Sequence, residues 1–296
     1  MCFWGGWCKY RGMAKVRFER FYVDVEGILR YYYLYVPEGV GEGSGVPLVI
    51  VLHGAGGNPR TVRNVTGMNE LADEEGFMVA YPQGTGPHDR QLTWNAGQCC
   101  GFAYENGIDD VAFMGILIET LSLEWPVDDR RIYAAGVSNG GMLAHRLGCE
   151  LSGQVAAVAA VAGTLPGETC RPREPVAVIM FHGTADPFVP FEGGQSKKTP
   201  LPQEPVSHTS VKETLLFWIG HNGCRGEAQV EEAGPVKKQV YGGGRNNTEV
   251  VLYTIHGGGH TWPGTNVGEP DAADPMQQIS ATPLIWQFFR NHPKAR

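Results

Sequence analysis

The sequence has little positive charge and no clustered basic residues. Its 296 residues hold 24 lysines and arginines against 31 aspartates and glutamates, a net charge of −7. Binding to nucleic acid needs a basic patch or stripe, and Lys and Arg never occur here in runs longer than a pair. The composition therefore argues against a nucleic-acid partner and favours a neutral or cationic one.

Long apolar runs and signal-peptide features are also missing. The longest apolar stretches, residues 47–57 and 155–163, are strand-sized and end in glycine, so we expect no membrane span. Residues 1–12, MCFWGGWCKYRG, have no basic start, continuous apolar core or small-residue cleavage site. We expect residues 1–12 to be a non-structural leader and residues 13–296 to form a single catalytic domain.

Paired cysteine and histidine spacings typical of metal sites do not occur. A metal site at His256 and His260 is disfavoured, because the glycines between them hold no helical geometry and no carboxylate partner is evident. The seven cysteines suit one or two disulfides in an oxidising compartment or free thiols in the cytosol. The pairing stays open among the five in the body of the chain, Cys99, Cys100, Cys149, Cys170 and Cys224.

Apolar strands alternate with amphipathic helices along most of the chain. Strands are expected in residues 47–54, 77–84, 130–138, 155–163, 174–183, 237–241 and 249–255, and helices in 66–76, 107–125, 139–150, 211–223 and 279–292. Residues 16–37 read as two strands joined by a tight turn at Glu26 and Gly27. The pattern predicts an α/β fold, a mostly parallel sheet with an antiparallel N-terminal edge and helices on both faces.

The segment GVSNG places Ser138 between Gly136 and Gly140, directly after a strand and before a helix. This is the arrangement of a nucleophile on a sharp strand-to-helix turn, where larger flanking side chains would strike their neighbours. The helix also directs its positive amino end at the serine. We predict Ser138 to be a catalytic nucleophile.

A serine nucleophile needs a base and an orienting acid, which in this sheet type follow in the order Ser, acid, His. Asp186 comes just after one later strand, and His260 follows the final strand. Asp109 and Asp110 are better explained as helix caps, and His182 as a structural residue in a turn. We predict the triad Ser138, Asp186 and His260, whose chemistry requires no cofactor and no metal.

Acyl transfer also needs two N–H groups for the oxyanion. One is predicted at Asn139, the residue after the nucleophile. The other is predicted at Ala55, with Gly54 as the alternative, in the glycine-rich loop HGAGGN after the strand at residues 47–54.

Several motifs occur together in one order: LHGAGGN, WNAGQCCG, DDVAFMGILIETL, RIYAAGVSNGGMLAHRLGCEL, FHGTADPFVPFEGG and GGGHTWPG. With them, residues 20–290 resemble the polyhydroxybutyrate depolymerase-like and feruloyl esterases, serine hydrolases of the α/β-hydrolase fold. The resemblance implies the same three triad residues. It also implies an extracellular or periplasmic location.

Four aromatic residues are expected to wall the substrate cleft: Trp94, Trp262, Phe188 and Tyr81. The short C-terminal end favours soluble feruloyl or cinnamoyl esters, hydrolysed through an acyl-enzyme, over solid polyester. A polyhydroxyalkanoate depolymerase or oligomer hydrolase is the alternative. The expected partner is a small or polymer-derived ester. The oligomeric state is left open, as is a lid role for residues 192–205, which favour a solvated loop.

Two other functions fit the same fold. A non-catalytic binding protein would keep the architecture without the reaction, and it would fail to react with a phosphonate probe. A peptidase would use the same triad on amides. Matched ester and amide substrates separate the peptidase from the esterase.

Overall fold

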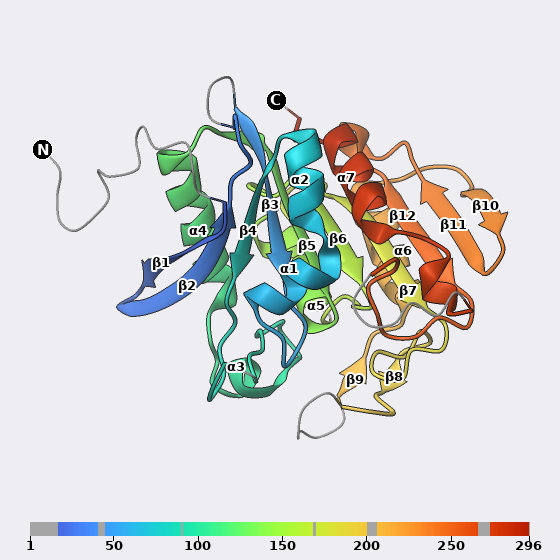
Figure 1. The fold of residues 1–296 in the computed structure, drawn as a ribbon. Coiled ribbons are helices and arrows are strands. Elements are labelled where there is room, and N and C mark those ends of the chain that lie inside the picture. The colour runs from blue at the N-terminus through green and yellow to red at the C-terminus, as the bar shows by residue number, and fades with distance from the viewer. Residues whose placement is uncertain are drawn as a thin grey trace, which may run out of the picture.

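The computed structural model describes residues 17–40, 45–89, 91–167, 170–199, 206–265 and 273–295. The expected leader, residues 1–12, lies outside these ranges. A ten-stranded sheet in the order β1-β2-β4-β3-β5-β6-β7-β12-β11-β10 crosses the molecule (Figure 1). In chain order its strands are β1 (Glu19–Val25), β2 (Ile28–Tyr35), β3 (Val46–Leu52), β4 (Met78–Pro82), β5 (Val127–Val137), β6 (Ala157–Val161), β7 (Ala177–Gly183), β10 (Gln229–Ala233), β11 (Val236–Tyr241) and β12 (Val250–Ile255).

The six central strands, from β4 to β12 in the sheet, run parallel, and both edges are antiparallel. At the N-terminal edge the turn expected at Glu26 and Gly27 joins β1 to β2, with both residues at positive φ. At the other edge β10 and β11 form a second antiparallel hairpin, of which the sequence pattern indicated only the β11 half. The predicted mostly parallel sheet with an antiparallel N-terminal edge is confirmed.

Helices cover both faces of the sheet, as expected. They are α1 (Pro59–Thr66), α2 (Met68–Glu75), α3 (Gly101–Glu105), α4 (Asp110–Glu124), α5 (Asn139–Glu150), α6 (Val211–Asn222) and α7 (Ala281–Asn291). Helices α1, α2 and α7 lie in front of the sheet in Figure 1 and share one apolar core, while α4, α5 and α6 contribute to the other. Along β3, Leu48 and Ile50 enter one core and Val49 and Val51 the other, because strand side chains alternate.

Helix starts follow local capping chemistry. Asn58 caps α1 through a capping box with Thr61, and Pro59 occupies the first turn, a signal that the expected single helix at residues 66–76 overlooked. Asp109 caps α4 by accepting from the Ala112 N–H at 2.8 Å. Asp110 has another role: its Oδ1 pairs with buried Arg30 at 2.6 Å and its Oδ2 accepts from the Asn95 N–H.

Four cysteines in the described residues form two disulfides. Cys149 is joined to Cys170 and Cys99 to its neighbour Cys100, whereas Cys224 is free. The first bridge connects the end of α5 to the segment before β7. In the part of the chain that the structure describes, no helix combines the length and apolar character needed to cross a membrane.

Candidate active site

Ser138 occupies a sharp turn between β5 and α5, at φ 57° and ψ −126°. Such a conformation is uncommon for a non-glycine residue and persists only where the surroundings enforce it. Here the glycines allow close approach: a Cβ on Gly136 would lie 2.2 Å from the Gly140 oxygen, and one on Gly140 2.4 Å from the Leu52 oxygen. The tight turn expected of GVSNG is therefore present.

Both backbone polar groups of Ser138 are hydrogen-bonded, whereas its hydroxyl makes no capping hydrogen bond. Its N–H donates to the Val161 oxygen of β6 at 2.8 Å, and its carbonyl accepts from the Met142 N–H of α5 at 3.0 Å. Although Ser138 is the N-cap residue of α5, its side chain makes no capping hydrogen bond. The half-buried hydroxyl thus sits at the positive end of a helix, where negative charge is stabilised.

Asp186 and His260 meet after the carboxyl ends of neighbouring strands β7 and β12. Nδ1 of His260 lies 2.7 Å from Oδ2 of Asp186. Because a carboxylate only accepts, Nδ1 carries the hydrogen and Nε2 of the neutral ring has a free lone pair. Within the described ranges Nε2 makes no hydrogen bond, and none joins His260 to Ser138. Apo structures of serine hydrolases often show this last contact long or unformed.

The Asp186 carboxylate is buried and stays ionised. Its other oxygen accepts from the N–H groups of Phe188 and Val189 at 2.8 and 2.9 Å. Burial by itself raises the pKa of Asp186, but the hydrogen bond and charge of His260 and the Val189 amide hold the pKa below its ordinary value. A charged acid is what a neighbouring imidazole needs when it takes up a proton.

His182, expected to be structural, also touches this acid. Its Nε2 donates to the Val189 oxygen at 2.8 Å and lies 3.4 Å from Oδ2 of Asp186. The ring is buried, and burial lowers its pKa. His182 therefore packs as a neutral ring that fixes the loop carrying Asp186.

The loop after β3 lies against the nucleophile. A Cβ on Gly54 would come within 3.2 Å of the Ser138 Cβ. The N–H groups of Gly56 and Gly57 are used by the Leu92 and Gly54 oxygens. Those of Gly54, Ala55 and Asn139 have no acceptor in the described part of the chain. These three donors include both positions predicted for the oxyanion.

His53 fixes this loop through both of its ring nitrogens. Nδ1 donates to the Gly54 oxygen at 2.8 Å, and Nε2 accepts from the Gly84 N–H at 3.0 Å. Burial lowers the pKa of His53 to about 4, so the ring is neutral at neutral pH. Sequence reasoning did not select His53, although the residue directly precedes the glycine loop.

Three of the four aromatic residues expected to wall the cleft are instead buried. Trp94, Trp262 and Tyr81 are 0%, 1% and 0% exposed, and each polar ring atom has a protein partner. They present no surface to a ligand, because they fill the cores on the two faces of the sheet. Phe188 differs: it is half-buried, with its ring centroid 4.9 Å from that of His260.

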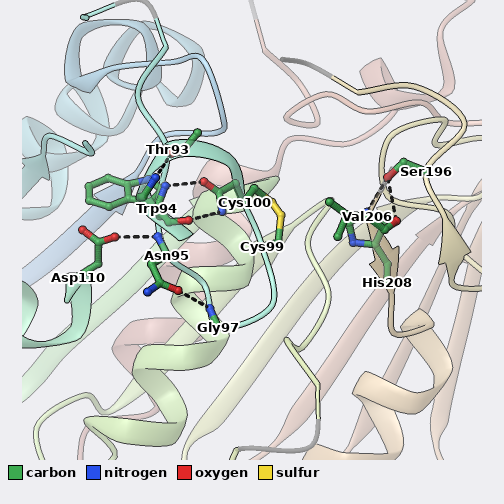
Figure 2. The surroundings of a disulfide bond; sticks show 12 residues. Thr93, Trp94, Asn95, Gly97, Cys99, Cys100, Asp110, Ser196, Val206 and His208 are labelled. Carbon is green, nitrogen blue, oxygen red and sulfur yellow. Dashed lines mark hydrogen bonds between the residues drawn. A yellow bond between two sulfur atoms is a disulfide. The ribbon is translucent and has the colours of Figure 1, made fainter. Parts of the chain in front are cut away.

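Trp94 nevertheless supports the site from beneath. The Asn139 side chain accepts from the Trp94 N–H at 2.7 Å and donates to the Trp94 oxygen at 3.0 Å. Trp94 in turn donates from its indole to the His53 oxygen at 2.8 Å. Figure 2 shows the segment from Thr93 to Cys100 around this ring. The first residue of α5 and the loop after β3 are thereby joined through one buried tryptophan.

Residues 192–205, considered as a loop or lid, contribute the short strand β8 (Gly194–Gln195), which pairs with β9 (Ser207–His208). Residues 200–205 lie outside the described ranges. The hairpin brings Ser196 and His208 to the same end of the sheet as the triad, and neither was a candidate from sequence. Among the described residues, no group of three or more histidine, cysteine or acidic side chains suits a metal ion.

Comparisons with known proteins indicate the family of the chain. A family model described as esterase PHB depolymerase matches residues 30–193. The protein NocK of Nocardia uniformis subsp. tsuyamanensis, whose name assigns it to the esterases, is 34% identical over 82% of this chain and 73% of its own length. Feruloyl esterase B of Piromyces equi is 32% identical over 76% of this chain, which spans only 41% of that protein.

A solved structure supports the fold. The acetyl xylan esterase from Aspergillus awamori superposes with a TM-score of 0.59 over 88% of this chain and 94% of that one, at 15% sequence identity. At this identity the likeness supports the α/β-hydrolase architecture alone.

Proposed function

The chain belongs to the esterase family of PHB depolymerases and is a carboxylic ester hydrolase, and from this premise we propose Ser138, Asp186 and His260 as its catalytic triad. The observation that carries the proposal is the 2.7 Å contact of His260 with a buried, ionised Asp186, at the same end of the sheet as the strained Ser138 turn. This contact fixes the tautomer in which the imidazole can act as a base.

The first step forms an acyl-enzyme. Nε2 of His260 takes the hydroxyl proton of Ser138 as the serine oxygen attacks the ester carbonyl, and Asp186 stabilises the resulting imidazolium. The oxyanion accepts from the N–H groups of Asn139 and Ala55, at the positive end of α5. Collapse expels the alcohol, which receives the proton from His260.

The second step releases the acid. His260 removes a proton from water, the hydroxide attacks the acyl carbonyl, and the same donors hold the second oxyanion. Ser138 then leaves with the proton from His260. In both steps His260 is the side chain that takes up the proton and returns it.

We propose soluble feruloyl or related cinnamoyl esters as the substrate class. Two relatives support it: feruloyl esterase B by name, and feruloyl esterase C of Emericella nidulans, which is 27% identical over 88% of this chain. Phe188 beside His260 offers an aromatic surface for such an acyl group. Hydroxyalkanoate oligomers are the second candidate, favoured by the description of the matching family model.

A phosphonate probe and a substrate panel test the proposal together. The probe should label Ser138 in the wild-type protein and not in Ser138→Ala. Methyl ferulate, a short nitrophenyl ester and hydroxybutyrate oligomers are then assayed, each beside a matched amide. We expect ester hydrolysis to fall by about 10⁶-fold in Ser138→Ala, as in other serine hydrolases.

Ser122→Ala is the matched control. Its hydroxyl donates to Asp129 on the surface, so activity should stay at the wild-type level. Hydrolysis of methyl ferulate surviving in Ser138→Ala would overturn the triad. Faster turnover of oligomers than of methyl ferulate would replace the substrate class and leave the mechanism intact.

A further inference from the structure

A small pocket opens near Ser138. None of its lining side chains has a role in the proposed reaction. It lies between α5, the loop after β6 and the β8–β9 hairpin, with Cys99, Met142, Leu165 and His208 among its lining residues. Figure 2 shows Cys99 and His208 coming from two separate segments of the chain. The free volume of about 10 Å³ is close to what a single water molecule needs.

Two links connect this pocket to Ser138. Met142 stands one helical turn beyond the nucleophile, and its N–H donates to the Ser138 oxygen at 3.0 Å. Thr164, which also lines the pocket, follows Gly163, where a Cβ would lie 2.7 Å from the same oxygen. Both links run to the backbone oxygen of Ser138, so the pocket lies close to the residue that carries the proposed ester.

The orientation of His208 is determined by Ser196. Ser196 Oγ lies 2.8 Å from Nε2 of His208 and 3.3 Å from the Val206 oxygen, which also accepts from the Ser196 N–H at 3.0 Å. The hydrogen bond to Ser196 uses Nε2 of His208, and Nδ1 has no hydrogen-bond partner within the described ranges. Burial lowers the pKa of His208 to about 4, so the ring is neutral at neutral pH.

The rest of the lining restricts what can enter. The polar lining side chains, which include Gln98, Thr164 and Thr209, are uncharged, and Met142 and Leu165 provide an apolar surface. A carboxylate or ammonium group would find no charged partner there, and burying an unpaired charge is costly. The pocket suits an uncharged polar group of the size of a hydroxyl group.

We infer that this pocket is a specificity subsite that binds a hydroxyl group of the substrate, with Nδ1 of His208 as the hydrogen-bonding partner. The inference rests on the proposed function, since it needs an ester at Ser138. The hydroxyl belongs either to the acid or to the alcohol of that ester, and the chemistry of recognition is the same in both cases. His208 is then a binding residue that selects among esters.

Two isosteric substrate pairs test the inference. Methyl 4-hydroxycinnamate and methyl 4-methylcinnamate differ by a hydroxyl on the acid, and 2-hydroxyethyl acetate and propyl acetate by one on the alcohol. We expect kcat/KM to favour the hydroxylated member of one pair by about 3- to 10-fold, the value of one neutral hydrogen bond. His208→Phe should bring that ratio close to one, and His208→Gln, which keeps an acceptor, should restore part of it.

His88→Phe is the matched control, because His88 is exposed and lies outside the pocket; its ratios should equal those of the wild type. If His208→Phe does not fold, Ser196→Ala should still reduce the ratio, because the ring loses its fixed orientation. No preference in either wild-type pair, or a preference unchanged in these variants, overturns the subsite. A wild type that hydrolyses neither pair contradicts the proposed function instead.

Discussion

His53 and His260 lie at the same end of the sheet, after β3 and β12, yet their ring nitrogens are used in opposite ways. Both nitrogens of His53 are occupied, by Gly54 and Gly84. His260 uses only Nδ1, toward Asp186, and its Nε2 has no partner within the described residues. A ring with two partners can hold a loop but cannot exchange a proton, whereas a ring with one partner can act as a base.

The surroundings reinforce this difference. The His53 ring is buried beside Trp94, and burial lowers its pKa to about 4. His260 instead keeps 13% of its side chain exposed next to the ionised carboxylate of Asp186. The position of a histidine at a strand end therefore says less about its role than its second nitrogen does.

Removing the charge of Asp186, which lies beside His260, should cause the largest loss of activity. In Asp186→Asn the amide can donate to Nδ1, which moves the ring hydrogen to Nε2 and removes the base. We expect kcat to fall by about 10⁴-fold, as for the equivalent change in serine proteases, with little change in KM. Steady-state kinetics on methyl ferulate measure it.

Asp109→Asn is the control for that change, since asparagine also caps helices well and Asp109 caps α4 away from the site. Its activity and thermal midpoint should match the wild type. An Asp186→Asn enzyme that kept a tenth of the wild-type kcat would show that Asp186 is not the acid of the triad.

A smaller loss of activity is expected when His53, which fixes the loop after β3, is replaced. His53→Leu removes one of the two hydrogen bonds to the Gly54 oxygen, leaves the Gly84 N–H without its partner and frees the loop that carries Ala55. Misplacing one oxyanion donor should lower kcat by about 10²-fold, with KM less affected. Kinetics and labelling by the phosphonate probe report the effect.

His292→Leu serves as a comparison of similar burial. His292 is 8% exposed at the end of α7, and its Nδ1 bonds the Phe288 oxygen. This variant should lose stability but keep kcat near the wild-type value. Equal kcat in His53→Leu and the wild type would remove His53 from any part in positioning the oxyanion loop.

The places of Ser138, Asp186 and His260 at strand ends were predictable because each residue carries a local signal. The glycines around Ser138 mark a sharp turn, and Asp186 and His260 both follow apolar runs that become parallel strands. Parallel strands bring their carboxyl ends to one edge, so order along the chain translates into proximity. The roles of these residues stay predictions until they are tested by substitution.

The walls of the cleft were not predictable in the same way. Trp94 and Trp262 stand near the site in sequence, but burial depends on what packs around a ring, which no local pattern contains. His208 was missed for the opposite reason: its partner Ser196 lies in a hairpin of two-residue strands, too short to leave a period. β10, QVEEA, is exposed throughout and shows no alternation of burial.

The pH dependence of stability reports the burial of His53. A histidine in the unfolded chain has a pKa of about 6.5. Between this pH and about pH 4, the unfolded chain binds a proton at His53, whereas the buried ring of the folded chain stays neutral. The stability due to neutral His53 is complete above pH 6.5 and falls as the solution is acidified, by about 2 kcal/mol at pH 5. Burial also lowers the pKa of His145 to about 3, which adds to the same loss.

Urea unfolding at neutral pH and near pH 5 measures this loss of stability in acid. The loss should be smaller in His53→Gln than in the wild type, while His88→Gln should keep the full loss. Identical acid losses in the two variants would mean that His53 has the same pKa in the folded and the unfolded chain, so burial would not keep its ring neutral near pH 5.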